Sequence, residues 1–228
     1  HHDPFEVLGC HPSAKGQTIR VFRPNCREMR LGEDGPEFQR IGDSDLFEWH
    51  GKAENLPQNY RLHWIDSAGH HHSAYDPYNF GPQISDYDLH LFGEGRHWHI
   101  HRVLGANPHE VDGIHGILFA VWAPNAERVS VIGDFNQWDG RVHPMRSRGG
   151  SGVWELFIPG LQAGDLYKFE FIGRTGDRLL KADPYGQAMT LRPDTASRIA
   201  PRSQFHWQDG DWMQRREHWQ WMHEPMSI

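Results

Sequence analysis

The chain has 228 residues, 37% of them hydrophobic and 23% charged, which is typical of a globular protein of one or two domains. Its formal net charge is −7, so a nucleic-acid partner is not expected, because such binding neutralises phosphates with Lys and Arg. No apolar run approaches the roughly 20 residues that span a bilayer, and no secretory leader opens the sequence, so we expect a cytoplasmic protein without membrane contact.

Part of the sequence occurs twice, at an offset of roughly 100 residues. Four short segments return in the same order, and the offset grows slowly along the chain. The pairs are 7–12 with 103–108, 21–25 with 121–125, 60–64 with 167–171 and 76–78 with 183–185. A duplication with small loop insertions explains this order, and a unit of this size can bury its own core. The repeat therefore predicts two tandem modules.

Alternation in the middle of the first repeat predicts a β-strand. Tyr60, Leu62 and Trp64 fall on one face of such a strand, and Arg61 and His63 fall on the other. We expect the first three in the core and the other two in solvent.

A different pattern separates the two repeats. Ile84, Tyr87 and Leu91 recur with the spacing of one helix face, and glycines follow at Gly93 and Gly95. This pattern predicts a short connecting helix over residues 84–94.

Histidine and cysteine side chains are possible metal ligands, and two cysteines can also form a disulfide bridge. His97, His99 and His101 would share one face of a strand, but they lack a second ligand group at the spacing of a zinc finger. We therefore predict no metal site and no cofactor. Cys10 and Cys26 are too few for a disulfide scaffold, and we expect two reduced thiols.

In the second repeat, Tyr167, Phe169 and Phe171 alternate with Lys168 and Glu170. This predicts a strand with three aromatic residues in the core and two charged residues in solvent. Further strands are predicted at 117–122, 129–131 and 153–158, with turns at 123–125, 149–152, 159–160 and 173–176.

Short strands with no helix between them favour an all-β fold of two tandem immunoglobulin-like β-sandwiches joined by a short helix. The expected units are a first sandwich at 1–83, a helical linker at 84–101, a second sandwich at 102–204 and a tail at 205–228.

The most specific motif is residues 129–140, where a strand runs into a Gly-Asp-Phe-Asn turn and Trp138 follows on a polar loop. Together with Gly152-Val153-Trp154-Glu155 and Tyr167-Lys168-Phe169, it resembles the glycogen-binding module of branching enzymes, isoamylases and the AMP-activated kinase β subunit. The whole chain resembles the N-terminal part of a bacterial 1,4-α-glucan (glycogen) branching enzyme with two such modules. The further segments that carry this resemblance are 3–9, 76–82, 112–113 and 192–197.

The resemblance implies a non-catalytic segment. In that family residues 225–228 lead into a catalytic barrel, which holds the nucleophile and the acid/base carboxylates of a retaining transfer from α-1,4 to α-1,6 linkages. No catalytic residue is therefore expected here, and Asp134 and Asp139 are interpreted as turn formers. The expected partners are α-1,4-glucan, as glycogen or maltooligosaccharide, and the catalytic barrel of the parent enzyme.

Three residues are candidates for sugar contact. Trp138 can stack on the apolar face of glucose, with filling of the sandwich core as the alternative. Lys168 matches a position that contacts glucan hydroxyls in the kinase module, with a solvated strand lysine as the alternative. Asn136 can bond a sugar or close its turn, and the turn is favoured.

Two departures from the family pattern weaken the expected site. The second stacking Trp of the kinase module is replaced by the segment 178–181, so binding is expected to be weak. The first repeat has the non-aromatic segment 31–36 where the second has its Trp loop, so we expect a structural spacer. The alternative function is that both modules only position the barrel.

The tail is rich in tryptophan and has few strand signals. We expect it to be a docking surface for the barrel. Its tryptophans are Trp207, Trp212, Trp219 and Trp221.

Overall fold

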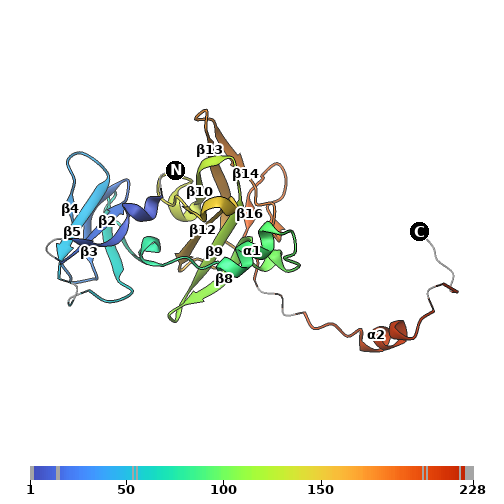
Figure 1. Cartoon of the computed structure of the whole chain (residues 1–228). Coiled ribbons are helices and arrows are strands. Elements are labelled where there is room, and N and C mark those ends of the chain that lie inside the picture. Colours follow the sequence, from blue (N-terminus) through green and yellow to red (C-terminus); the bar gives the residue numbers. More distant parts are fainter. Residues whose placement is uncertain are drawn as a thin grey trace.

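The computed structural model describes residues 3–13, 16–52, 54, 56–201, 203, 205–220 and 222–223. Two β-sandwiches follow one another along the chain, and a short helix, α2, lies apart from both (Figure 1). The predicted all-β class with immunoglobulin-like sandwiches is confirmed.

The first sandwich is built from two antiparallel sheets. One sheet has the order β1-β2-β5-β4, and the other has the order β3-β6-β7. The bounds are β1 Gly9–Ser13, β2 Gly16–Phe22, β3 Cys26–Leu31, β4 Gln39–Arg40, β5 Leu46–Gly51, β6 Arg61–Asp66 and β7 His71–Tyr75. Tyr60 and Leu62 are buried between the sheets and Arg61 is exposed, as the alternation predicts, whereas His63 and Trp64 are both half-buried.

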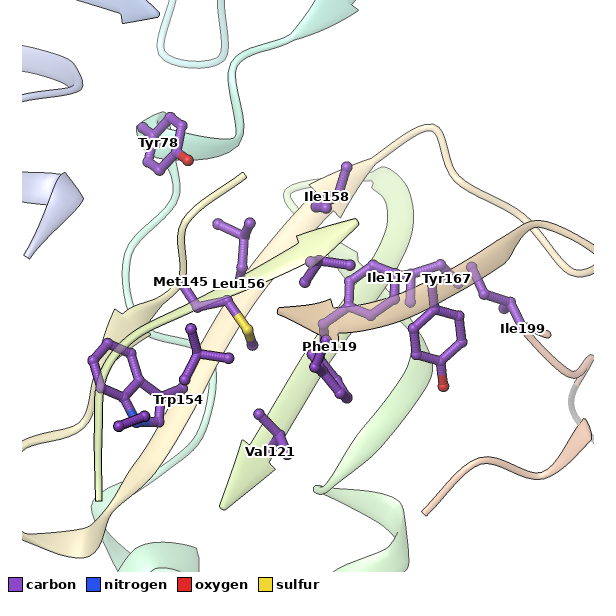
Figure 2. Packing of buried hydrophobic residues seen from close by; sticks show 14 of the residues in the cluster. Tyr78, Ile117, Phe119, Val121, Met145, Trp154, Leu156, Ile158, Tyr167 and Ile199 are labelled. Atoms are coloured by element: carbon purple, nitrogen blue, oxygen red, sulfur yellow. The ribbon is translucent and has the colours of Figure 1, made fainter. Parts of the chain in front are cut away.

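The second sandwich repeats this plan and extends it. Its sheets have the orders β11-β12-β9-β8 and β10-β13-β16-β15, with β14 paired to β13. The bounds are β8 Gly105–Val111, β9 Ile114–Trp122, β10 Ala126–Gly133, β11 Arg146–Ser147, β12 Val153–Pro159, β13 Leu166–Gly173, β14 Arg178–Lys181, β15 Ala188–Met189 and β16 Ser197–Arg198. The core between the sheets is drawn in Figure 2, with Phe119, Trp154 and Tyr167 almost fully buried.

The strand orders confirm the duplication. Sheet β1-β2-β5-β4 corresponds to β8-β9-β12-β11, and sheet β3-β6-β7 corresponds to β10-β13-β14. Even an irregularity is repeated, because the pairing register shifts at Cys26/Glu28 in the first module and at Ala126/Arg128 in the second.

A buried Tyr–Asp pair occurs at the same place in both modules. Tyr60 Oη donates to Asp76 Oδ2 at 2.6 Å, and Tyr167 Oη donates to Asp183 Oδ2 at 2.5 Å. Each aspartate also accepts a backbone N–H two residues later through its other oxygen. Burial raises the pKa of both carboxyl groups, and the tyrosine hydrogen bond opposes that shift.

Tyr78 forms part of the interface between the two modules. Its hydroxyl donates to the carbonyl oxygens of Val142 and Pro144, at 3.2 Å each. Tyr78 and Leu8, both from the first repeat, pack into the core of the second sandwich. Burial of these apolar side chains ties the second sandwich to the first.

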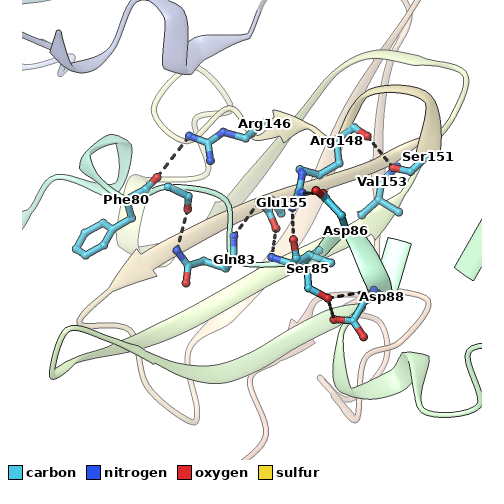
Figure 3. A network of polar contacts seen from close by, with 12 residues as sticks. Phe80, Gln83, Ser85, Asp86, Asp88, Arg146, Arg148, Ser151, Val153 and Glu155 are labelled. Atoms are coloured by element: carbon cyan, nitrogen blue, oxygen red, sulfur yellow. Dashed lines mark hydrogen bonds and ion pairs between the residues drawn. The ribbon is translucent and has the colours of Figure 1, made fainter. Parts of the chain in front are cut away.

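The predicted connecting helix is confirmed as α1, Asp86–Gly93, with Ser85 as its N-cap. The segment before it is held by Glu155, whose side chain is only 4% exposed and accepts the backbone N–H groups of Gln83 and Ile84 (Figure 3). Arg148 pairs with Glu155 at 3.1 Å. Among the described residues, 3-10 turns also occur at Pro4–Glu6, Pro77–Asn79, Ile100–Arg102, Asp134–Asn136 and Gly149–Ser151.

The tail carries the helix α2, Gly210–Glu217, whose residues are exposed along its length. Trp207, Trp212 and Trp219 are 78%, 43% and 41% exposed. Trp221 and residues 224–228 lie outside the described residues. None of the helices that the structure describes is long and apolar enough to cross a membrane.

The predicted exposure of Glu170 is wrong. Its side chain is 4% exposed and forms ion pairs with Arg128 at 3.3 Å and Arg178 at 2.6 Å. The loop at Gly140 covers it, since a Cβ added to that glycine would lie 2.1 Å from Glu170 Oε1. Alternation identified the face of the sheet correctly, but a covering loop can bury the outer face as well.

The two cysteines form no bridge, and His97, His99 and His101 do not share one face of a strand. Cys10 and Cys26 are free, as expected. His97 forms a hydrogen bond with Asp88 at 2.8 Å. His99 directly precedes the 3-10 turn Ile100–Arg102 and His101 lies within it, so neither is on a strand. No group of three or more metal-ligating side chains occurs among the residues that the structure describes.

Candidate functional site

The loop that follows β10 is closed by Asn136. The Asn136 Oδ1 accepts the Gly133 N–H at 2.9 Å, and the Nδ2 donates to Val131 O and to His143 Nδ1, both at 2.9 Å. Asn136 is only 5% exposed. The structure therefore favours the turn-closing alternative for this residue, because its hydrogen-bonding groups are all used inside the loop.

Trp138 is held on the rim of this loop. Gln137 and Trp138 both adopt left-handed backbone conformations, with φ of 56° and 59°. The Trp138 backbone N–H donates to Gly133 O at 2.9 Å, and the indole Nε1 donates to Asp134 Oδ1 at 2.8 Å. Trp138 is half-buried and belongs to none of the described core clusters. The core-filling alternative is therefore not what the structure shows.

The two left-handed residues make the Trp138 position costly. A non-glycine residue in this conformation costs of order 1 kcal/mol or more, and it persists where the surroundings fix it. Here the Asn136 bonds and the Asp134 bond fix the loop. An indole held in this way is a preorganised surface.

Lys168 lies on the outer face of the sheet, opposite Ile132. Its Nζ donates to Thr195 Oγ1 at 2.7 Å. Thr195 belongs to a turn closed by the Thr190 and Ala196 backbones, and Leu191 in the same turn is 90% exposed. The sequence motif at 192–197 carried part of the family resemblance, but it did not indicate that Thr195 would contact Lys168.

Register brings the Trp loop and Lys168 to one face. Lys168 and Glu170 are two residues apart in β13 and so share the outer face, and Gly140 covers Glu170. Trp138 is two residues before Gly140, and its backbone bonds Gly133, which pairs with Tyr167. The Trp138 backbone is thus anchored at the end of the β10–β13 pair that carries Lys168, and Asn136 is buried within the loop.

The acidic residues of the loop are engaged in local contacts. Asp139 binds Arg141 through both carboxylate oxygens, at 2.7–3.1 Å, and this hydrogen bonding lowers the pKa of Asp139. Asp134 accepts the indole N–H of Trp138. Both side chains therefore shape the loop, which agrees with their interpretation as turn formers.

A β-sandwich that presents a fixed indole and a lysine on an open face has the features of a carbohydrate-binding module. Comparison with known proteins agrees. Residues 103–186 match the family described as carbohydrate-binding module 48 (isoamylase N-terminal domain). Residues 1–78 match the N-terminal domain of the alpha-1,4-glucan branching enzyme GlgB.

Similar full-length sequences carry the same name. The chain is 57% identical over 229 residues to the 1,4-alpha-glucan branching enzyme GlgB of Methylococcus capsulatus and 54% identical over 230 residues to that of Nitrosococcus oceani. Both matches cover 100% of this chain and 31% of the relative. A maltotriose complex of a PulA mutant from Klebsiella pneumoniae matches with a TM-score of 0.38 and 14% identity, over 85% of this chain and 24% of that one.

Over its whole length the chain matches the N-terminal region of 1,4-alpha-glucan branching enzymes, and its second module matches carbohydrate-binding module 48. The chain spans about a third of the length of the relatives that it matches.

Proposed function

We propose that the second sandwich binds α-1,4-glucan weakly through Trp138 and Lys168. The observation that supports this most is the fixed indole of Trp138, outside the core and on the same face as Lys168. Glucose would stack on the indole, and the Lys168 ammonium and the Thr195 hydroxyl would donate to sugar hydroxyls. Leu191 adds apolar surface in place of a second aromatic residue.

In the longer protein, this surface would hold glycogen or a maltooligosaccharide while a catalytic barrel transfers a chain segment from an α-1,4 to an α-1,6 linkage. The first sandwich would position the second and the barrel, because its equivalent loop at 31–36 carries no aromatic residue. The units that we propose are those expected from the sequence, at 1–83, 84–101, 102–204 and 205–228, in a cytoplasmic protein.

Native gel retardation in glycogen tests the binding site. We expect Trp138→Ala to abolish retardation, since loss of a stacking anchor costs about 1 to 3 kcal/mol, which removes most of a weak affinity. Lys168→Ala should only reduce it. Trp98→Ala is the matched control, because Trp98 is 90% exposed in the linker and should leave retardation unchanged.

The opposite result supports the structural alternative. If Trp138→Ala migrates like the unmodified chain in glycogen, with an unchanged circular dichroism spectrum, Trp138 is not the sugar platform. If the unmodified chain itself is not retarded, the modules act only as spacers.

A further inference from the structure

A cavity of about 410 Å³ lies between the two sandwiches, and neither Trp138 nor Lys168 lines it. Its walls carry two arginines and two histidines, and they carry no Asp or Glu among the described residues. The chain as a whole has a net charge of −7, so this is an unusual environment within the protein. The polar and aromatic residues that matter are Arg23, Arg61, Trp64, His115 and His143.

Arg23 is half-buried, and its buried Nε lacks a hydrogen-bond partner in the described part of the chain. Its guanidinium lies 4.3 Å from the centroid of the Trp64 ring. No ion pair with a described carboxylate is found for Arg23. Burial lowers the pKa of Arg23, and Asp76 opposes that shift through space. An unsatisfied buried N–H costs about 1–3 kcal/mol, so its presence calls for an explanation.

The duplication provides an internal control. The residue equivalent to Arg23 in the second module is Ala123. The Tyr167–Asp183 pair nevertheless forms there with the same geometry as the pair beside Arg23. A buried aspartate at this place in the fold therefore does not need an arginine neighbour, and Arg23 is not explained by a need to neutralise Asp76.

The other donors come from both modules. The hydrogen bonds of Asn136 to Gly133 and Val131 fix the orientation of its amide, so its Nδ2 donates to the Nδ1 of His143. The ring proton of His143 is therefore on Nε2. Burial, and to a smaller extent Arg23, lower the pKa of His143 to about 3, so it is a neutral donor. Arg61 is exposed at the rim, and its Nε donates to Ser73 Oγ at 3.1 Å.

We propose that this cavity binds a phosphate group, either as inorganic phosphate or as the phosphate monoester of a small sugar, between Arg23 and Arg61. Guanidinium groups match the geometry of phosphate oxygens, and the Arg23 Nε would gain the partner that it lacks. His143 would donate from the second module, so the bound anion would connect the two sandwiches. The cavity volume falls within the usual range for small-molecule sites and exceeds what a phosphate ion alone fills, which favours the monoester.

Calorimetric titration of the 228-residue chain tests this, in a phosphate-free buffer at constant ionic strength, with inorganic phosphate and with glucose 6-phosphate. We expect saturable binding of one ligand per chain, tighter for the monoester. Equal affinity would assign the site to free phosphate. The same ligand should raise the unfolding temperature, because it binds only the folded state.

Substitutions of single arginines test whether the phosphate binds in this cavity. Arg23→Gln and Arg61→Gln should each weaken binding at least about tenfold, the loss of one charge-assisted contact. Arg27→Gln is the matched control, since its side chain is 70% exposed in the same module, and it should change the affinity less than about twofold. Arg61→Gln should leave retardation in glycogen unchanged, which separates this site from the proposed glucan surface.

The proposal fails if neither probe binds saturably, if Arg61→Gln binds as well as the unmodified chain, or if Arg27→Gln weakens binding equally. Arg61 is exposed at the rim, so this comparison stands even if Arg23→Gln does not fold.

Discussion

Replacement of Tyr167 by Phe should destabilise the second sandwich in a pH-dependent way. Tyr167 is 1% exposed and Asp183 is 6% exposed, so the change removes the hydroxyl that donates to a buried carboxylate at 2.5 Å. A hydrogen bond to a charged group contributes about 1.5–3 kcal/mol, and a neutral one contributes about 0.5–1.5 kcal/mol. We therefore expect a loss of about 2 kcal/mol in the free energy of unfolding at pH 8.

The pH dependence follows from the pKa of Asp183, which burial raises and the Tyr167 hydrogen bond lowers. Because the folded-state pKa lies above the unfolded value, the folded protein binds the proton more tightly, and stability falls as the pH rises through the folded pKa. Loss of the Tyr167 hydroxyl raises that pKa further. The cost of Tyr167→Phe should thus be complete above the folded pKa and shrink to about 1 kcal/mol as the pH falls below it.

Urea unfolding followed by circular dichroism over a series of pH values, from pH 8 down into the acid range, measures both limits. Tyr60→Phe should reproduce the effect in the first sandwich, since Tyr60 bonds Asp76 in the same way. Tyr87→Phe is the control, because Tyr87 is 69% exposed on α1 and should cost nothing measurable. A Tyr167→Phe cost no larger than that of the control at pH 8, or one that does not change with pH, would contradict this role of the Tyr167 hydroxyl.

Two further substitutions test the buried carboxylates of the second sandwich. Gly140→Ala places a Cβ 2.1 Å from the carboxylate of Glu170, which two arginines hold in place. This substitution should lower the free energy of unfolding by about 1–3 kcal/mol and weaken retardation in glycogen. Gly150→Ala is the control, because open space surrounds Gly150, and it should change neither quantity. Arg148→Met leaves Glu155 buried without its counter-ion and should cost about 3 kcal/mol in urea unfolding, and adding Glu155→Gln should recover part of the loss. Full stability of either single variant, or no recovery in the double variant, would contradict these assignments.

The duplication and the alternation of apolar residues determined the architecture from the sequence alone. Period-2 patterns such as Tyr167 to Phe171 identify a strand and its core face, because successive side chains point to opposite sides of a sheet. A connecting helix forms where the spacing of Ile84, Tyr87 and Leu91 predicts it, but its packed face is a different one, because Tyr87 is 69% exposed and Leu89 and Phe92 contact the core. The order of the repeated segments was sufficient to predict that both modules share one strand order, which the sheets confirm.

The role of Asn136 and the burial of Glu170 were decided only by the tertiary structure. The sequence left Asn136 between a sugar contact and a turn, and the contacts with Val131 and His143 show that its side chain is used within the loop. Glu170 is buried because a loop thirty residues earlier in the sequence folds over the sheet, and local alternation carries no information about such a cover.

The site and the inter-module cavity both depend on contacts between distant segments. Thr195 reaches Lys168, and Arg23 lines a cavity with His143, across separations that no local pattern encodes. Local propensity and periodicity fix which residues form strands and which face is apolar. The packing of loops and modules against those strands then determines which polar side chains remain available to bind a ligand.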